Sequence, residues 1–300
     1  MTLNRKLLSI PGQLDGKTCL VTGANAGLGK AMSVELARRG AKIIMGCRRE
    51  YFREMKEIRQ KSGNPSVVLR LLDLSRMNSI DLFCRELAEE GVSLDIVMCN
   101  AGMVSSRNEF SQDGFPLMLQ VNFLGYARML RRLLESGVIS KDDHSMGIPR
   151  IICTSSTKHK GQLSIDFDHF GVLPEGGVKD VLKVYGLSKL YLMTYAWELA
   201  RRSSENGKPE LSIFAFCPGP FRSKIGRNLG FPGSLVMSLM PNGPEKAVWP
   251  AIYLACSPEL EGETMVYFHK RREEEADKRV ADPMNGEKVW QKTNELLEQV

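Results

Sequence analysis

Hydrophobic residues along this chain follow two alternating patterns. Short continuous apolar runs, such as 41–47 (AKIIMGC) and 94–99 (LDIVMC), are typical of strands that are buried on both faces. Longer segments with helical spacing lie between these runs. The predicted strands are 18–21, 41–47, 67–72, 94–99, 150–154, 211–217 and 264–268. The predicted helices are 27–39, 50–61, 80–90, 117–134, 185–202, 244–256 and 286–298.

Strands that alternate with helices predict an α/β fold. Parallel strands need crossover connections, and right-handed crossovers give a doubly wound sheet of about seven strands with helices on both faces, a Rossmann fold. The chain has no Pro/Ser-rich linker and no internal repeat, so we expect a single domain over 1–300. The C-terminal tail helix, 286–298, is expected to pack on this domain; homo-oligomerisation is its alternative role.

Composition narrows the functional classes. With 43% hydrophobic and 25% charged residues, the 300-residue chain is typical of globular proteins. Its net charge of +6 favours anionic ligands such as phosphates but is too small and dispersed to indicate nucleic acid. The seven Cys form no C-x-x-C pair and the four His lack ligand spacing, so no metal site is expected. Neither a signal peptide nor a transmembrane segment is recognisable, and a cytoplasmic location is expected.

A glycine-rich turn follows the first predicted strand and opens the first predicted helix, at 22–29 (TGANAGLG). Glycines in this context allow a tight turn and a close approach of the backbone to a pyrophosphate at the helix N-terminus. The alternative is a turn that only packs helix against strand. The residues expected to contact a dinucleotide here are Thr22, Gly23, Asn25, Ala26, Gly27, Leu28 and Gly29.

Tyr185 and Lys189 are four residues apart on a predicted helix, so they share one face. A neighbouring cation favours the phenolate and should lower the pKa of the Tyr185 phenol toward neutrality. Such a pair can donate and accept protons near pH 7. The same spacing is also common among surface neighbours. Tyr191 and Tyr195 have no Lys four residues further on and are expected to be packing residues.

The spacing of the glycines, T-G-x-x-x-G-x-G, resembles that of the short-chain dehydrogenase/reductase family. Further motifs that resemble those of the family follow in the same order over most of the chain, although Cys99 replaces the first Asn of N-N-A-G. These motifs hold Asp73, Leu74, Asn100, Ala101, Gly102, Asn122, Ser156, Tyr185, Lys189, Pro218, Gly219 and Ser223.

The resemblance implies hydride transfer between a nicotinamide and a carbonyl or alcohol carbon. Tyr185 would exchange a proton with the substrate oxygen, while Lys189 would lower the Tyr185 pKa and hold the nicotinamide ribose. Ser156 would hydrogen-bond the substrate oxygen, and Asn122 would support a water relay to Lys189. Ser155 is the alternative to Ser156. The remaining residues implied at the cofactor are Asp73, Leu74, Asn100, Ala101, Gly102, Pro218, Gly219 and Ser223. Of these, Ser223 could bind the carboxamide.

The end of the second predicted strand indicates which dinucleotide is used. An acidic residue there would repel a 2′-phosphate, but this chain has Cys47 followed by Arg48 and Arg49. Two guanidinium groups suit a phosphate, so we expect NADP(H) to be preferred over NAD(H). The alternative is that both arginines face water.

Two segments bear on the substrate. The long connection 158–184 and the tail sequence 287–290 (EKVW) resemble the retinol dehydrogenase-like and WW-domain oxidoreductase-like branch, although no WW domain and no N-terminal membrane anchor are recognisable. This implies a lipophilic small-molecule alcohol or carbonyl substrate that is retinoid-, steroid- or aldehyde-like. Segment 221–240 is interpreted as a lid, with a short core helix or a peripheral membrane contact as alternatives. His159, flanked by Lys158 and Lys160, is expected in an exposed loop, with a contact to the substrate as the alternative.

Two other functions remain to be weighed. A non-catalytic dinucleotide-binding scaffold or regulatory protein would not need Asn122, Ser156, Tyr185 and Lys189 together. An epimerase or dehydratase would be expected to show T-G-x-x-G-x-x-G and a large separate C-terminal domain, and this chain has neither.

Overall fold

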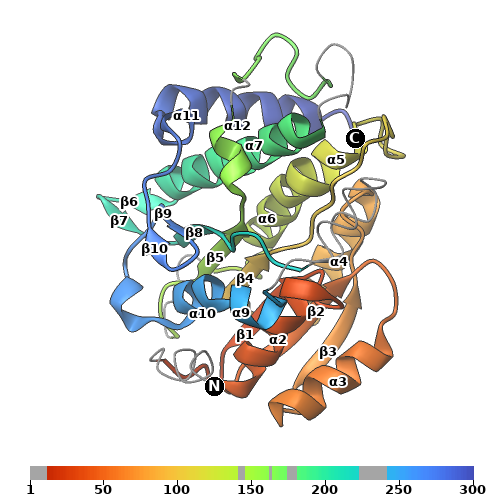
Figure 1. Cartoon of the computed structure of the whole chain (residues 1–300), viewed down its shortest axis with the longest axis vertical. Helices are drawn as coiled ribbons and strands as arrows, with labels where there is room; N and C mark the ends of the chain where they lie inside the picture. The colour runs from red at the N-terminus through yellow and green to blue at the C-terminus, as the bar shows by residue number, and fades with distance from the viewer. Residues whose placement is uncertain (1–11, 141–145, 162–163, 174–180, 223–241) are drawn as a thin grey trace.

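The computed structural model describes residues 12–140, 146–161, 164–173, 181–222 and 242–300. Its centre is an eight-stranded sheet in the order β10-β9-β8-β5-β4-β1-β2-β3 (Figure 1). All neighbouring strands are parallel except β10, which runs antiparallel to β9. The strands are β1 (Thr18–Thr22), β2 (Lys42–Cys47), β3 (Val67–Leu71), β4 (Ile96–Cys99), β5 (Arg150–Thr154), β8 (Ser212–Cys217), β9 (Val266–His269) and β10 (Arg272–Glu273).

The predicted doubly wound α/β fold is confirmed, with one strand more than expected. The additional strand, β10, has two residues and could not be recognised from periodicity. A separate hairpin, β6 (Ser204–Glu205) with β7 (Lys208–Pro209), projects beyond α7.

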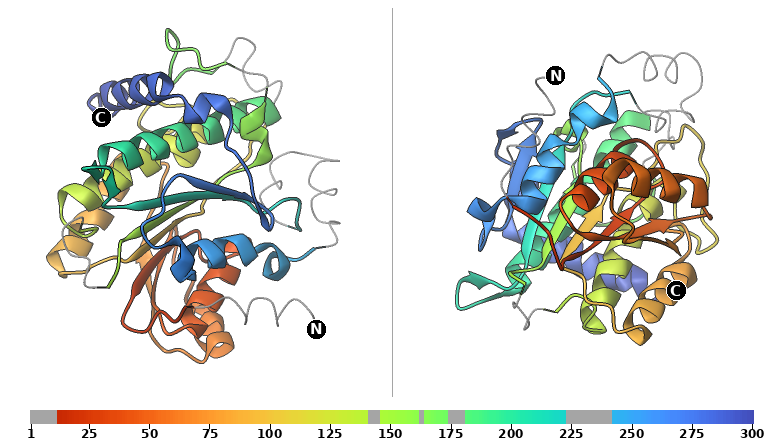
Figure 2. Two further views of the ribbon diagram at one scale, coloured as in Figure 1. Left: turned by 90° about the vertical axis from the view of Figure 1, so that its left-hand side faces the viewer. Right: turned by 90° about the horizontal axis from the view of Figure 1, so that it is seen from below.

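Helices cover both faces of the sheet (Figure 2). Alternate strand residues supply the two cores: Leu20 and Ile44 belong to one, while Val21 and Ile43 belong to the other. The first face is covered by α4 (Met77–Glu89), α6 (Gly125–Glu135) and α7 (Val181–Arg202), with α11 (Lys278–Ala281) and α12 (Pro283–Leu297) on α7. The second face is covered by α2 (Gly27–Arg38), α3 (Phe52–Ser62), α9 (Pro244–Ala247) and α10 (Trp249–Cys256).

Two helices that the sequence predicts as continuous are interrupted. The segment 117–134 consists of α5 (Leu117–Leu119), a π-helical turn (Gln120–Leu124) and α6. The segment 244–256 is divided into α9 and α10 next to Pro250, which lacks a backbone N–H.

The C-terminal helix packs on the same domain. The Trp290 ring of α12 stacks on Tyr195 of α7 at 4.9 Å between centroids, and the Arg202 guanidinium lies 4.8 Å from the Trp290 centroid. Among the described residues, no helix is both long and apolar enough to cross a bilayer. The predicted lid 221–240 lies outside the described residues, apart from Phe221 and Arg222.

The hydroxyl of Thr22 joins the carboxyl ends of β1 and β4. It donates to the Met98 carbonyl at 3.1 Å and accepts from the backbone N–H groups of Asn100 and Ala101 at 2.9 and 3.0 Å. The Tyr126 hydroxyl lies 2.9 Å from it and donates to the Ala101 carbonyl at 2.6 Å. This buried network fixes the loop after β4 against the glycine-rich turn.

We predict that Thr22→Val lowers the free energy of unfolding by about 3 kcal/mol, because it leaves two backbone N–H groups without an acceptor. Urea unfolding followed by circular dichroism measures this change. The matched control is Thr194→Val, since the buried Thr194 hydroxyl donates only to the Leu190 carbonyl within its own helix. Equal losses in the two variants would contradict the role assigned to Thr22.

Candidate active site

The turn between β1 and α2 is shaped by close backbone contacts. A Cβ atom at Gly29 would lie 2.4 Å from the Gly23 carbonyl oxygen and 2.6 Å from Nδ2 of Asn100, so only glycine fits. At Gly27, where φ is +53°, a Cβ would have nothing within 4 Å. The first turn of α2 therefore presents unpaired N–H groups to open space, an arrangement that suits a pyrophosphate.

A cavity of about 860 Å³ runs along the carboxyl edge of the sheet from this turn to the ends of β5, β8 and β9. Its elongated course past β2 and β3 suits a dinucleotide at the point where the strand order reverses, between β1 and β4. The predicted residues that line it are Thr22, Gly23, Asn25, Ala26, Gly27, Leu28, Arg48, Asp73, Leu74, Asn100, Ala101, Gly102, Ser156, Tyr185, Pro218 and Gly219.

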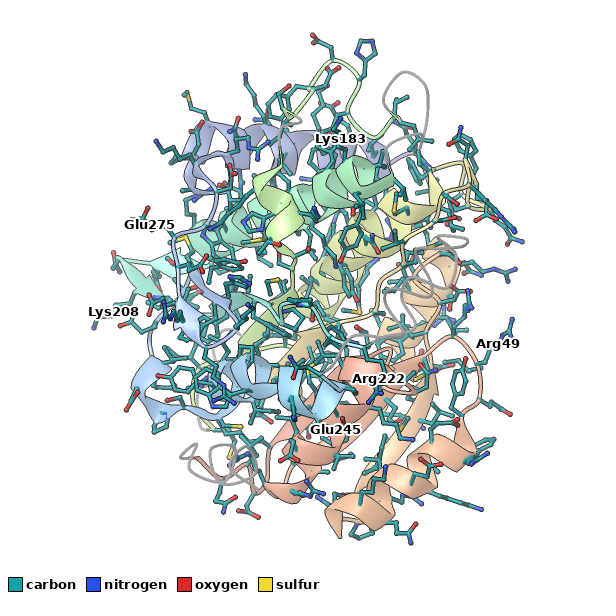
Figure 3. The ribbon with its side chains drawn as sticks, in the orientation of Figure 1. Arg49, Lys183, Lys208, Arg222, Glu245 and Glu275 are labelled. Carbon is teal, nitrogen blue, oxygen red and sulfur yellow. The ribbon has the colours of Figure 1, made fainter. Side chains whose placement is uncertain are left out.

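The other predicted site residues lie elsewhere. Gly29, Asn122 and Lys189 are buried beside the cavity and do not line it. Arg49 lines a neighbouring cavity of about 430 Å³, which it shares with Arg48 and Asp73, and lies at the outer edge of the molecule (Figure 3). Ser223 lies outside the described residues.

Tyr185 keeps partial access to the cavity and packs beside Met118 and Val184. Desolvation by the surrounding protein raises the pKa of its phenol, the nearby Cys217 thiol adds to the increase, and a hydrogen bond with Ser156 opposes it. The net shift is therefore upward, opposite to the lowering toward neutrality that the Tyr185–Lys189 spacing predicts. Lys189 Nζ lies over the ring, 5.9 Å from its centroid, and desolvation of the phenol is the largest influence on the pKa.

Lys189 is buried beneath the cavity, with 2% of its surface exposed. Its ammonium donates to the Thr154 carbonyl, at the end of β5, at 2.9 Å. Burial lowers the pKa of Lys189 to about 8, and the neighbouring Cys153, Cys99 and Cys217 thiols oppose that change. The side chain therefore changes charge close to neutral pH.

Asn122 lies in the π-helical turn Gln120–Leu124. The wider turn of a π-helix shifts its side chain from the position that it would have in a regular α-helix. Its Oδ1 accepts from the Met103 N–H at 2.8 Å, and its Nδ2 donates to the Met103 carbonyl at 2.9 Å and to Ser188 Oγ at 3.1 Å. A Cβ at Gly102 would lie 3.1 Å from Asn122 Oδ1 and 3.6 Å from Lys189 Nζ. Gly102 thus leaves room between the amide and the ammonium.

The two serines at the end of β5 differ in environment. Ser155 is buried, and its hydroxyl donates to Met193 Sδ at 2.7 Å. Ser156 precedes the 3-10 turn Thr157–Lys160, and its hydroxyl accepts from the Lys158 N–H at 3.3 Å and pairs with Tyr185. Ser156 is therefore the serine that faces the phenol.

His159 is buried, contrary to the exposed loop expected from its Lys neighbours. Its exposed fraction is 1%, its Nδ1 lies 2.5 Å from the Ser156 carbonyl, and its ring packs edge-on against Tyr267 at 5.2 Å. The 3-10 turn folds back on Ser156 and carries the ring inward, a tertiary effect that local charge does not reveal.

The sequence also left several cavity-lining residues unassigned. Lys158, Leu182, Cys217 and Lys270 all line it. Cys217 and Lys270 could have been found by position, because Cys217 ends one predicted strand, Lys270 lies two residues after another, and such positions meet at the carboxyl edge. No metal-binding cluster of His, Cys, Asp or Glu occurs in the described part of the chain.

Comparison with known proteins places the chain in a family. The family model for short chain dehydrogenase matches residues 17–163. Human retinol dehydrogenase 14 is 33% identical over 93% of this chain and 86% of its own length, and human retinol dehydrogenase 13 is 32% identical over 95% and 85%.

Solved structures share the fold. An uncharacterised protein from Mycobacterium paratuberculosis superposes with a TM-score of 0.73 at 22% identity, covering 97% of each chain. A Shigella flexneri short chain dehydrogenase in complex with NADP gives 0.66 at 18% identity, covering 87% of this chain and 99% of that one. The chain therefore belongs to the short-chain dehydrogenase/reductase family, in its retinol dehydrogenase-like branch, and is an oxidoreductase of alcohol or carbonyl groups.

Proposed function

We propose that this protein transfers a hydride between NADP(H) and the carbonyl or alcohol carbon of a lipophilic small molecule. The observation that carries the proposal is that Tyr185 and Ser156 line the same cavity as the glycine-rich turn, with Lys189 directly beneath. The nicotinamide dinucleotide, when bound, supplies or accepts the hydride. The protein's own groups bind, orient and move the proton.

Tyr185 is the proposed proton donor in the direction of reduction. Because its pKa is raised, the phenol holds its proton at neutral pH and can give it to the substrate oxygen. Ser156, which is hydrogen-bonded to the phenol, is placed to donate to the same oxygen where negative charge develops. In the direction of oxidation the Tyr185 oxygen takes the proton instead.

Lys189, buried beside the cavity, assists this proton transfer through its charge. Its ammonium lies over the Tyr185 ring and stabilises the phenolate that remains after donation. With a pKa of about 8 it can also hold or release a proton near neutral pH. Asn122 lies next to the gap at Gly102, so we propose that it orders a water that connects to Lys189.

The preference for NADP(H) is proposed from charge at the end of β2. Cys47 is buried there and carries no carboxylate, while Arg48 lines the cavity and Arg49 stands beside it. Neither arginine forms an ion pair with any described residue. Both are therefore available for a 2′-phosphate.

A lipophilic substrate is proposed from the wall near Tyr185. Met103 packs in the same cluster as Tyr185, and Val104, Leu182 and Phe221 also line the cavity. Apolar side chains that surround a few convergent polar groups are typical of small-molecule sites. A non-catalytic scaffold is not favoured, because it would have no use for Tyr185, Ser156 and Lys189 at the cavity.

Tyr185→Phe is predicted to lower kcat by at least about a hundredfold, because it removes the only proposed proton donor. NADPH absorbance measures turnover, and fluorescence titration with NADPH measures binding, which should be retained. Tyr191→Phe is the matched control, since Tyr191 lies on the same helix but packs on Phe170 at 4.6 Å. Near wild-type turnover by Tyr185→Phe would exclude the mechanism.

Arg48→Ala is predicted to reduce the ratio of kcat/KM for NADPH over NADH by about tenfold, through loss of a charge-assisted hydrogen bond to the 2′-phosphate. Arg53→Ala is the control, because Arg53 is exposed and pairs with Glu57 on α3. A preference for NADH that Arg48→Ala leaves unchanged would overturn the cofactor assignment.

A further inference from the structure

Lysine side chains gather where the cavity meets the ends of β5, β8 and β9. Lys158 stands two residues after Ser156, and its carbonyl and Cβ face Gly186, the neighbour of Tyr185. Lys270 follows β9, and its stem lies across Gly219, where a Cβ would be 2.8 Å from Lys270 Cε. Both line the same cavity as Tyr185, so this end of the site carries two ammonium groups.

The conformation of Lys270 is unusual for a lysine. It occupies the first position of the two-residue turn between β9 and β10 with φ of +57°, in the left-handed region. Glycine is favoured in such turns, and side chains other than Gly and Asn are disfavoured there. In this conformation the Lys270 stem lies along Gly219, and both residues line the cavity.

The two ammonium groups are not neutralised by the described protein. Asp73 is the only acidic residue among the described cavity-lining residues, and it lies at the far end beside Arg48. Glu274, which follows β10, forms ion pairs with Lys160 at 3.2 Å and with His269 at 3.0 Å. Neither Lys158 nor Lys270 forms an ion pair with a described residue.

We propose that the substrate is amphiphilic, with an apolar body that carries a carbonyl or alcohol group and an anionic group, such as a carboxylate, that Lys158 and Lys270 bind. This inference rests on the proposed function, because it assigns the substrate class of the same cavity. The apolar wall from Met103 to Leu182 holds the body, while the lysines at the mouth hold the charge. Two cations that line the same cavity as Tyr185, without an ion pair to a described residue, attract an anion and repel a cation.

The test compares ω-oxododecanoic acid with its methyl ester, which differ in the negative charge. In the wild-type protein with NADPH, kcat/KM for the acid should exceed that for the ester by about tenfold, and the ratio should fall as salt is raised. Lys158→Met and Lys270→Met should each lower the ratio about threefold, and the double variant should bring it close to one. Isothermal titration calorimetry of both compounds gives a second measurement that does not depend on turnover.

Lys208→Met is the matched control, because Lys208 is exposed on the β6–β7 hairpin, well away from the cavity (Figure 3). In this variant, the ratio of kcat/KM for the acid to kcat/KM for the ester should equal that of the wild type. Retained turnover of the ester by the lysine variants shows that their chemistry is intact.

Two results would overturn the proposal. Equal kcat/KM and equal binding of acid and ester in the wild type would show that the lysines do not select charge, while the proposed function stands on the turnover itself. A raised KM for NADPH in Lys270→Met, with an unchanged acid-to-ester ratio, would assign the ammonium to the cofactor. Failure to oxidise NADPH with either compound counts against the proposed function, and calorimetry then decides the charge preference alone.

Discussion

The burial of Lys189 is the constraint on which the rest of this site depends. An ammonium taken out of water costs several kcal/mol unless it is hydrogen-bonded. Here the Thr154 carbonyl accepts a hydrogen bond from it, and the surrounding thiols oppose the lowering of the Lys189 pKa by burial. This cost falls at the carboxyl edge of the sheet. Burial there lowers the pKa of Lys189 to about 8 and raises the pKa of Tyr185, so the phenol keeps its proton at neutral pH.

The strand order brings the parts of the site together from distant positions in the chain. Because β1, β4, β5 and β8 are parallel and adjacent, their carboxyl ends meet, and the segments that follow them form one cavity. The Thr22 hydroxyl couples the first two of these ends, and the Lys189 ammonium binds the third. In the proposed mechanism, binding of the dinucleotide and delivery of the proton depend on the same edge.

Features set by local sequence could be predicted, and features set by tertiary packing could not. The alternation of strands and helices and the glycine-rich turn follow from side-chain periodicity and backbone sterics, so the fold and the cofactor cradle were recognisable. The direction of the Tyr185 pKa shift, the burial of His159 and the π-helical turn at Asn122 depend on how α7 and the turn after Ser156 pack. Charge neighbours in the sequence do not report desolvation, which is the largest influence on the pKa values of Tyr185, Lys189 and His159.

The most direct test of this account is the titration of Lys189 by carbon-13 NMR of its ε-methylene group, assigned by loss of the signal in Lys189→Met. A buried ammonium that changes charge during proton delivery should titrate with a midpoint of about 8. A midpoint at the ordinary lysine value of 10.5 would show that water reaches the group and would contradict the account.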